Sequence, residues 1–190
     1  SMLLSISNPA LAQINDLGVF GYWRVYGGRS GNGTPVCGAM TRFSDQSRSF
    51  HIKHFKGNSY LVIQAFKNSW TIPNGTEVNV QINIDRLDGW VAKSIGYGDR
   101  LEWTIGLNNM EKFINEFRFG SLMRLSFPQG DELDWHVSLT GSQAAMAAFA
   151  QCTQRLTLNR DESQPFGRER SQPYRAASQP YAPSPTPLLP

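Results

Sequence analysis

The sequence predicts a mainly β fold, either a β-sandwich or an open barrel, with two helices and a disordered proline-rich C-terminal tail. Eight or nine short apolar segments, separated at close intervals by turn residues, are the basis of the β prediction. Two further segments, at about residues 110–118 and 142–152, have helical spacing or helix-forming composition. The 190 residues are 40% hydrophobic, which is enough for one core. We therefore expect one globular domain over residues 13–158.

The clearest strand covers residues 77–84, where valines and isoleucines alternate with polar residues. Such alternation indicates one buried and one solvated face. Residues 27–33 are rich in glycine and read as a loop. Turn-forming residues at 96–99 and 128–131 predict two hairpins, each joining the strands on either side. The expected strands are residues 19–26, 36–43, 49–55, 60–66, 77–84, 90–95, 101–105, 122–127 and 133–139.

The first expected helix has apolar residues at helical spacing, of which Phe113 and Phe117 are the largest. Asn109 can cap its N-terminus, and Gly120 suits its C-terminal end. The second helix begins at Ser142, for which a capping role is expected, and is rich in alanine.

Cys37 and Cys152 bracket nearly the whole domain. An even pair in an exported chain is usually a disulfide, whereas in the cytosol the same pair would more often be two separate buried thiols. With a disulfide, the second helix would present Cys152 at its end to the strand that carries Cys37. Two cysteines and three histidines give no zinc or iron–sulfur spacing, so we expect no metal and no cofactor.

Export is indicated by the small residues Ala10 and Ala12, which follow an apolar run in the spacing of a signal-peptidase site. Residues 1–12 are interpreted as the remnant of a signal peptide; the alternative is an apolar N-terminus that frays. No stretch approaches the roughly 18 consecutive apolar residues of a membrane span. We therefore expect a periplasmic or secreted protein that does not span a membrane.

Residues 159–190 contain seven of the eleven prolines and repeat one phrase, Ser-Gln-Pro-aromatic, three times. Such a composition buries too little apolar surface to offset its ordering entropy, so a disordered tail is expected. The repeats end in Phe166, Tyr174 and Tyr181, which are candidate binding residues of a docking arm. A passive spacer is the alternative, and the composition alone favours it.

The net charge of +3 belongs mostly to this end of the chain, because residues 155–190 carry +2 of it. The rest of the chain is close to neutral. Nucleic-acid domains depend on basic groups set against phosphates, so this charge distribution disfavours a nucleic-acid partner.

The sequence offers one weak catalytic arrangement. Asp134 and His136 would share a strand face and are conceivable as an acid/base pair, but the alternation strongly favours a solvated hairpin. His51 and His54 are three residues apart, which on a strand places them on opposite faces and argues against a shared metal. No catalytic residue is predicted.

Tryptophans are better candidates for binding. Trp103 and Trp135 share the register of apolar neighbours and are expected in the core. Trp70 and Trp90 stand beside turns and are candidate residues of a recognition surface for a sugar, a peptide or a membrane partner.

Several features together resemble the invasion-associated locus B family of alphaproteobacterial exported proteins. They are Trp-Arg-Val at residues 23–25 with a cysteine soon after, residues 69–75 leading into a valine-rich strand, the helix end at 117–120, and residues 137–142 followed by the alanine-rich helix. The resemblance spans about residues 20–154 and is one of layout. It implies an exported β-rich envelope domain, associated in some pathogens with the invasion of host cells. The tail has no counterpart in the family pattern.

These observations predict a non-enzymatic, exported binding module that engages another envelope protein or a host protein. Two alternatives stay open. One is an envelope hydrolase that uses Asp134 and His136, and the other is a structural protein whose tail threads into the cell wall.

Overall fold

The computed structural model describes residues 13–158 of the chain. The expected signal-peptide remnant at 1–12 and the expected tail at 159–190 lie outside the described residues, as do Phe166, Tyr174 and Tyr181. The described elements are β1 (Gln13–Phe20), β2 (Trp23–Arg29), β3 (Pro35–Arg42), β4 (Arg48–Phe55), β5 (Tyr60–Lys67), β6 (Glu77–Ile84), β7 (Trp90–Tyr97), β8 (Arg100–Gly106), α1 (Leu107–Phe119), β9 (Leu122–Ser126), β10 (Trp135–Ser138) and α2 (Ser142–Leu158).

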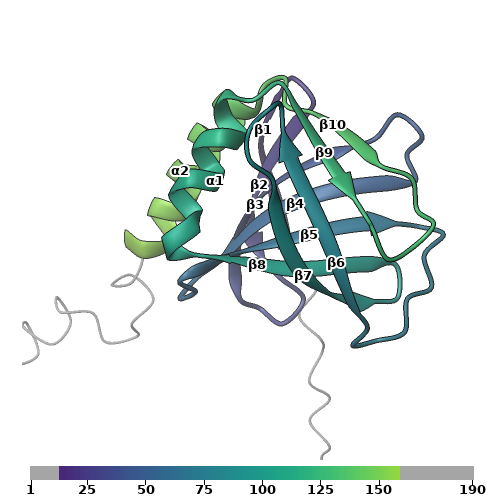
Figure 1. The fold of residues 1–190 in the computed structure, drawn as a ribbon. Coiled ribbons are helices and arrows are strands. Elements are labelled where there is room, and N and C mark those ends of the chain that lie inside the picture. Colours follow the sequence, from purple (N-terminus) through teal and green to yellow (C-terminus); the bar gives the residue numbers. More distant parts are fainter. Residues whose placement is uncertain (1–12, 159–190) are drawn as a thin grey trace, which may run out of the picture.

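All ten strands belong to one antiparallel sheet in the order β1-β2-β3-β4-β5-β8-β7-β6-β9-β10. The sheet curls so that its first and last parts approach each other (Figure 1). At this approach the Tyr22 backbone N–H donates to the Thr140 carbonyl at 3.2 Å, and the Trp23 indole N–H donates to the Ser138 carbonyl at 3.1 Å. The mainly β class is confirmed. Because the sheet is single and continuous, it fits an open barrel and not a sandwich of two sheets.

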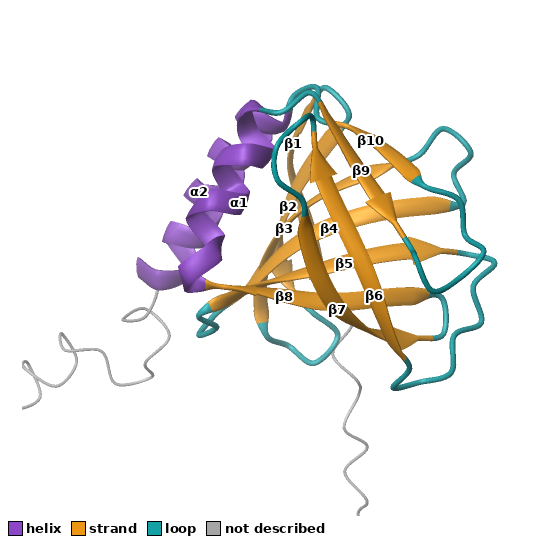
Figure 2. Cartoon of the chain, in the orientation of Figure 1, coloured by secondary structure: helices purple, strands orange, loops and turns teal. Residues whose placement is uncertain are grey.

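The two helices lie side by side along one flank of the curled sheet (Figure 2). α2 contacts β1, β2 and β3, and α1 contacts β5 and β8. No helix within residues 13–158 is long and apolar enough to cross a membrane.

One hydrophobic core fills the concave side of the sheet and includes the fully buried Trp23. The Trp23 ring meets Phe50 and Phe117 edge-on, at centroid distances of 6.3 and 4.8 Å. Trp103 and Trp135 are buried in the same core, as expected. Each large apolar side chain buried in this way contributes roughly 1.5–3 kcal/mol.

A disulfide joins Cys37 on β3 to Cys152 on α2, with Cα atoms 5.9 Å apart, which confirms the expected pairing. Cys152 lies inside α2, not at its end, because the helix continues to Leu158. Gly27 pairs with Cys37 across β2 and β3, and a Cβ at Gly27 would lie only 2.9 Å from the Cys152 sulfur. This close approach explains why residue 27 is glycine.

The N-terminal region differs from the prediction. Residues 19–26 form a hairpin instead of one strand, because Gly21 adopts a φ of +58° and turns the chain between β1 and β2. The expected loop at 27–33 begins only after β2 has ended at Arg29. Gly28, with φ +154°, lets β1 approach, since a Cβ there would meet the Gln13 carbonyl oxygen at 1.9 Å.

The expected helix caps also differ. α1 begins at Leu107 with Gly106 as its N-cap, so Asn109 lies inside the helix. Ser142 starts α2 as expected, but its hydroxyl donates to the Phe117 carbonyl at 2.8 Å and thereby binds the last turn of α1. The C-cap of α1 is Gly120, as expected; its backbone is extended, and a Cβ there would meet Ile84 at 2.5 Å.

Candidate functional site

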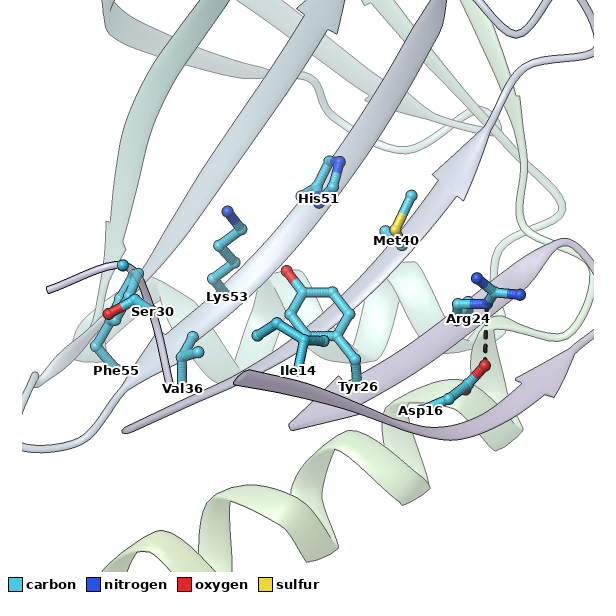
Figure 3. A pocket seen from close by; sticks show the side chains of 11 residues that line it. Ile14, Asp16, Arg24, Tyr26, Ser30, Val36, Met40, His51, Lys53 and Phe55 are labelled. Carbon is cyan, nitrogen blue, oxygen red and sulfur yellow. Dashed lines mark ion pairs between the residues drawn. The ribbon is translucent and has the colours of Figure 1, made fainter. Parts of the chain in front are cut away.

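A pocket of about 480 Å³ opens on the convex face of the sheet, across β1 to β4 (Figure 3). Strand alternation places it there: Phe50 and Ile52 of β4 face the core, so His51 and Lys53 face the opposite side. The lining residues are Ile14, Asp16, Arg24, Tyr26, Ser30, Gly31, Val36, Met40, His51, Lys53 and Phe55.

Tyr26 forms the floor of this pocket. It pairs with Gly38 across β2 and β3, and a Cβ at Gly38 would lie 2.1 Å from the Tyr26 ring, so the ring can lie flat only over glycine. The hydroxyl points toward the strand that carries His51 and Lys53 (Figure 3). Burial raises the pKa of Tyr26, so the phenol is protonated at neutral pH and can donate a hydrogen bond.

His51 stands in the wall of the pocket as a neutral imidazole. Burial first, and then the positive charges of Lys53 and Arg42, lower the pKa of His51 to about 3. Its Nε2 lies 3.1 Å from the Ser49 hydroxyl, whereas its Nδ1 is buried without a hydrogen-bond partner among the described residues. A buried polar atom without a hydrogen-bond partner lowers the stability of the fold unless a ligand or water supplies the hydrogen bond.

Lys53 supplies the positive charge of the pocket. It is half-buried, and burial lowers the pKa of its ammonium group. Its Nζ lies 6.0 Å from the centre of the Phe66 ring. The ion pairs formed within residues 13–158 do not include Lys53, while the other cation of the lining, Arg24, is paired with Asp16 at 3.3 Å. The pocket therefore holds one cation that forms no ion pair in the described part of the chain, and the carboxylate of Glu102 acts on it only from a longer distance.

The pocket borders β1, which is the first strand of the sheet order and, among the described strands, pairs only with β2. Its apolar side chains are unusually open: Ile14 is 47% exposed, Leu17 39% and Val19 62%. The pairing shifts between Asp16 and Gly18, so Leu17 forms a bulge. An edge strand with exposed apolar side chains is a template for pairing with another chain.

The two tryptophans singled out from the sequence are both half-buried at the edge of the core. The Trp70 indole N–H lies 3.1 Å from a Glu132 carboxylate oxygen. The Trp90 N–H donates to Glu116 at 2.6 Å, and the Lys112 ammonium lies 4.3 Å from the centre of its ring. These contacts hold both indoles in place, and a role of either in recognition stays a prediction.

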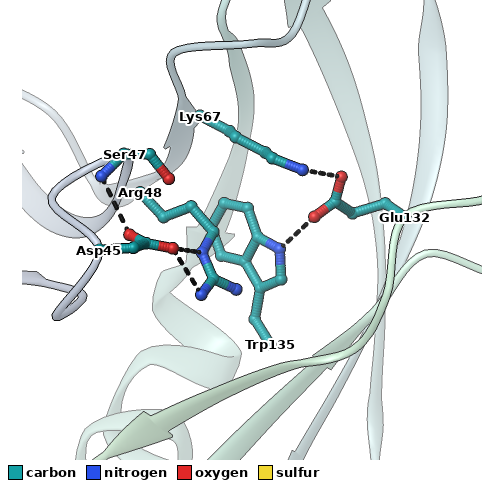
Figure 4. A network of polar contacts seen from close by, with 6 residues as sticks. All are labelled: Asp45, Ser47, Arg48, Lys67, Glu132 and Trp135. Carbon is teal, nitrogen blue, oxygen red and sulfur yellow. Dashed lines mark hydrogen bonds and ion pairs between the residues drawn. The ribbon is translucent and has the colours of Figure 1, made fainter.

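Glu132 is a structural residue that the sequence analysis did not single out. One carboxylate oxygen accepts from Lys67 at 2.6 Å, and the other accepts from the Trp135 indole at 2.8 Å (Figure 4). Burial would raise the pKa of Glu132, but the hydrogen bonds from Lys67, Trp135 and Trp70 outweigh it and hold the pKa below its ordinary value. The carboxylate thus ties the loop before β10 to β5. Lys67 and Trp70 are 65 and 62 residues away in the sequence, a separation that hides the contact from sequence patterns.

Asp134 and His136 both lie on the solvated surface, with Trp135 and Val137 buried between and beside them. Asp134 pairs with Arg124 across the hairpin at 3.7 Å. Leu133, which the expected strand at 133–139 included, is 82% exposed, because β10 begins only at Trp135. His51 and His54 lie on opposite faces of β4: His51 lines the pocket, and the His54 ring contacts the Asn58 carbonyl at 3.0 Å.

Comparison with known proteins gives one structural likeness. No family model matches the chain, and no curated protein does. Among solved structures, the chain is similar to the crystal structure of invasion associated protein B from Bartonella henselae, at 12% sequence identity and a TM-score of 0.48. The alignment covers 76% of this chain and 99% of that one. The matched protein carries the name of the family that the sequence resembles.

Proposed function

We propose that this chain is a non-enzymatic binding module of the cell envelope, exported to the periplasm or secreted, which holds another protein by strand addition at β1. The observation that carries the proposal is the open edge of the sheet. β1 has no strand on its outer side within the described residues, and three of its apolar side chains are exposed. An extended segment of a partner can complete the backbone hydrogen bonds there and cover those side chains.

The compartment is supported by two observations that are independent of the edge strand. The disulfide between Cys37 and Cys152 is of a kind that persists in oxidising compartments. The spacing of Ala10 and Ala12 has the form of an export cleavage site. In such a compartment the partner is another envelope protein or a protein of a host cell.

The test begins with a crosslinking pull-down from the envelope of the source organism, followed by binding measurements with the purified partner. A lysine on an edge strand opposes strand addition, so Val19→Lys will weaken binding at least tenfold. Val91→Lys is the matched control, because Val91 is 73% exposed and lies on β7, inside the sheet. Equal binding by both variants would exclude β1 as the docking edge.

A further inference from the structure

We propose that the pocket on the convex face of β1 to β4 binds a small monocarboxylate with an apolar body, with the carboxylate beside Lys53 and Tyr26 and the apolar body over Val36 and Met40. This site goes beyond the proposed function, because its ligand is a small molecule and its binding needs no protein partner.

The charge of the ligand follows from the charges that line the pocket. Arg24 and Asp16 neutralise each other at 3.3 Å, and Figure 3 shows this pair at one end of the pocket. Lys53 forms no ion pair within residues 13–158. The carboxylate of Glu102 acts on its charge from a longer distance, but Glu102 accepts from Gln64 at 2.6 Å and pairs with Arg100 at 3.9 Å. One unpaired cation matches one negative charge, and burying that cation favours a ligand that neutralises it.

The hydrogen-bonding groups also suit a carboxylate. The Tyr26 hydroxyl points toward the His51 and Lys53 strand, and burial keeps it protonated and therefore able to donate. The Nδ1 atom of His51 is buried and lacks a partner in residues 13–158. A carboxylate has two oxygens and about four acceptor positions, so it can accept from a phenol, an ammonium group and an imidazole N–H at once.

The apolar side chains of the pocket determine the apolar part of the ligand. Ile14, Val36, Met40 and Phe55 surround the polar groups with apolar surface. A volume of about 480 Å³ lies within the usual range for small-molecule sites and exceeds what an inorganic anion fills. The pocket combines an apolar lining with a few convergent polar groups, which is the usual composition of a ligand site.

The probe for the test is sodium octanoate, titrated into full-length protein that carries ¹³C-methyl methionine, with the Met40 methyl signal as the readout. We expect a saturable shift of this signal. Lys53→Met will weaken octanoate binding about tenfold or more, because a charge-assisted hydrogen bond is lost. Lys93→Met removes the same charge from an exposed position on β7 and will leave binding unchanged.

Two further measurements keep the test decisive. Octan-1-ol has the same chain without the charge and will bind at least tenfold more weakly than octanoate. Met40→Trp fills the pocket from a half-buried position. Because this variant lacks the Met40 signal, its binding is followed instead by saturation-transfer NMR on the octanoate signals, with wild type alongside, and we expect the transfer to be abolished even if Lys53→Met does not fold. Equal binding of the alcohol and the acid, equal binding by Lys53→Met and wild type, or no saturation below about 10 mM would each overturn the proposal. Val19→Lys, which blocks the edge strand outside the pocket lining, will still bind octanoate, so failure of one proposal leaves the other testable.

Discussion

The indole rings of Trp70 and Trp135 are stacked, with centroids 5.1 Å apart and planes inclined by 18°. Their N–H groups reach the two oxygens of one carboxylate, that of Glu132, at 3.1 and 2.8 Å. Two tryptophans from distant parts of the chain are therefore held by a single acidic side chain in the loop that precedes β10.

Glu132→Gln will destabilise the domain by about 1–3 kcal/mol, because the amide cannot accept at both positions and weakens the contact with Lys67. The measurement is the free energy of unfolding from urea titration followed by tryptophan fluorescence. Asp134→Asn is the matched control, since Asp134 is an exposed neighbour whose partner Arg124 lies 3.7 Å away. If Asp134→Asn lowered the unfolding free energy as much as Glu132→Gln, the charge of the loop, and not the indole contacts, would account for the stabilisation.

His51 predicts an acid sensitivity with a defined sign. The pKa of its imidazole falls from 6.5 to about 3 on folding, so the unfolded chain binds more protons between these values. The contribution of neutral His51 to the unfolding free energy is therefore fully present above pH 6.5. It is lost as the pH falls toward 3, with a slope of at most about 1.4 kcal/mol per pH unit. His51→Gln will flatten the stability profile in this window. The exposed control His136→Gln will keep the wild-type slope. If His51→Gln also keeps the wild-type slope, a group other than His51 causes the acid sensitivity.

Reduction of the disulfide will lower the unfolding free energy by several kcal/mol. The two cysteines are separated by 115 residues, for which the chain-entropy model gives about 4–5 kcal/mol. Urea unfolding with and without a reductant measures the difference, and Cys37→Ala/Cys152→Ala is expected to match the reduced protein. Material from the native compartment that reacts with two equivalents of a thiol reagent would contradict the bond itself.

Gly38→Ala will displace the Tyr26 ring from the pocket floor. The new methyl carbon would lie 2.1 Å from the ring, and forced packing of this kind costs about 1–3 kcal/mol. Exposure of the ring will lower the raised pKa of the Tyr26 phenol toward its ordinary value, because that pKa depends on burial. Alkaline titration followed by ultraviolet absorbance measures this change. Gly31→Ala is the control in the same lining, since a Cβ there meets no atom within 4 Å.

Removal of residues 159–190 tests the docking-arm hypothesis. The three Ser-Gln-Pro-aromatic repeats lie in this segment, while the core cluster of the described residues is built from side chains between Trp23 and Cys152. We expect an unchanged unfolding curve and, if the tail docks, a narrower set of crosslinked envelope partners. An identical set of partners for both chains would favour the passive spacer.

The fold was predictable where one local signal dominates. β6 occupies the expected residues 77–84 because its alternation places Val80, Ile82 and Ile84 in the core. α2 begins at Ser142 as expected, since its composition favours a helix under most tertiary surroundings. β1 was missed because it contains Asn15, Asp16 and Gly18, residues of low strand propensity that an edge strand tolerates.

The candidate site was less accessible to sequence reasoning. Its floor and walls come from Tyr26, His51 and Lys53, which meet only because Gly38 of β3 lies between Tyr26 and Lys53 in register. Nothing in the local sequence pattern singles out Glu132. Its partners Lys67 and Trp70 belong to β5 and the turn after it, so only the closed sheet brings them together.

The position of the disulfide has a consequence for biosynthesis. Cys37 is made 115 residues before Cys152, an interval of roughly ten seconds at ordinary translation speeds. During that time Cys37 has no cysteine to pair with, because Cys152 is the other of the two cysteines in the sequence. The bond can close only after α2 has been made, so it cannot lock a premature hairpin of β2 and β3.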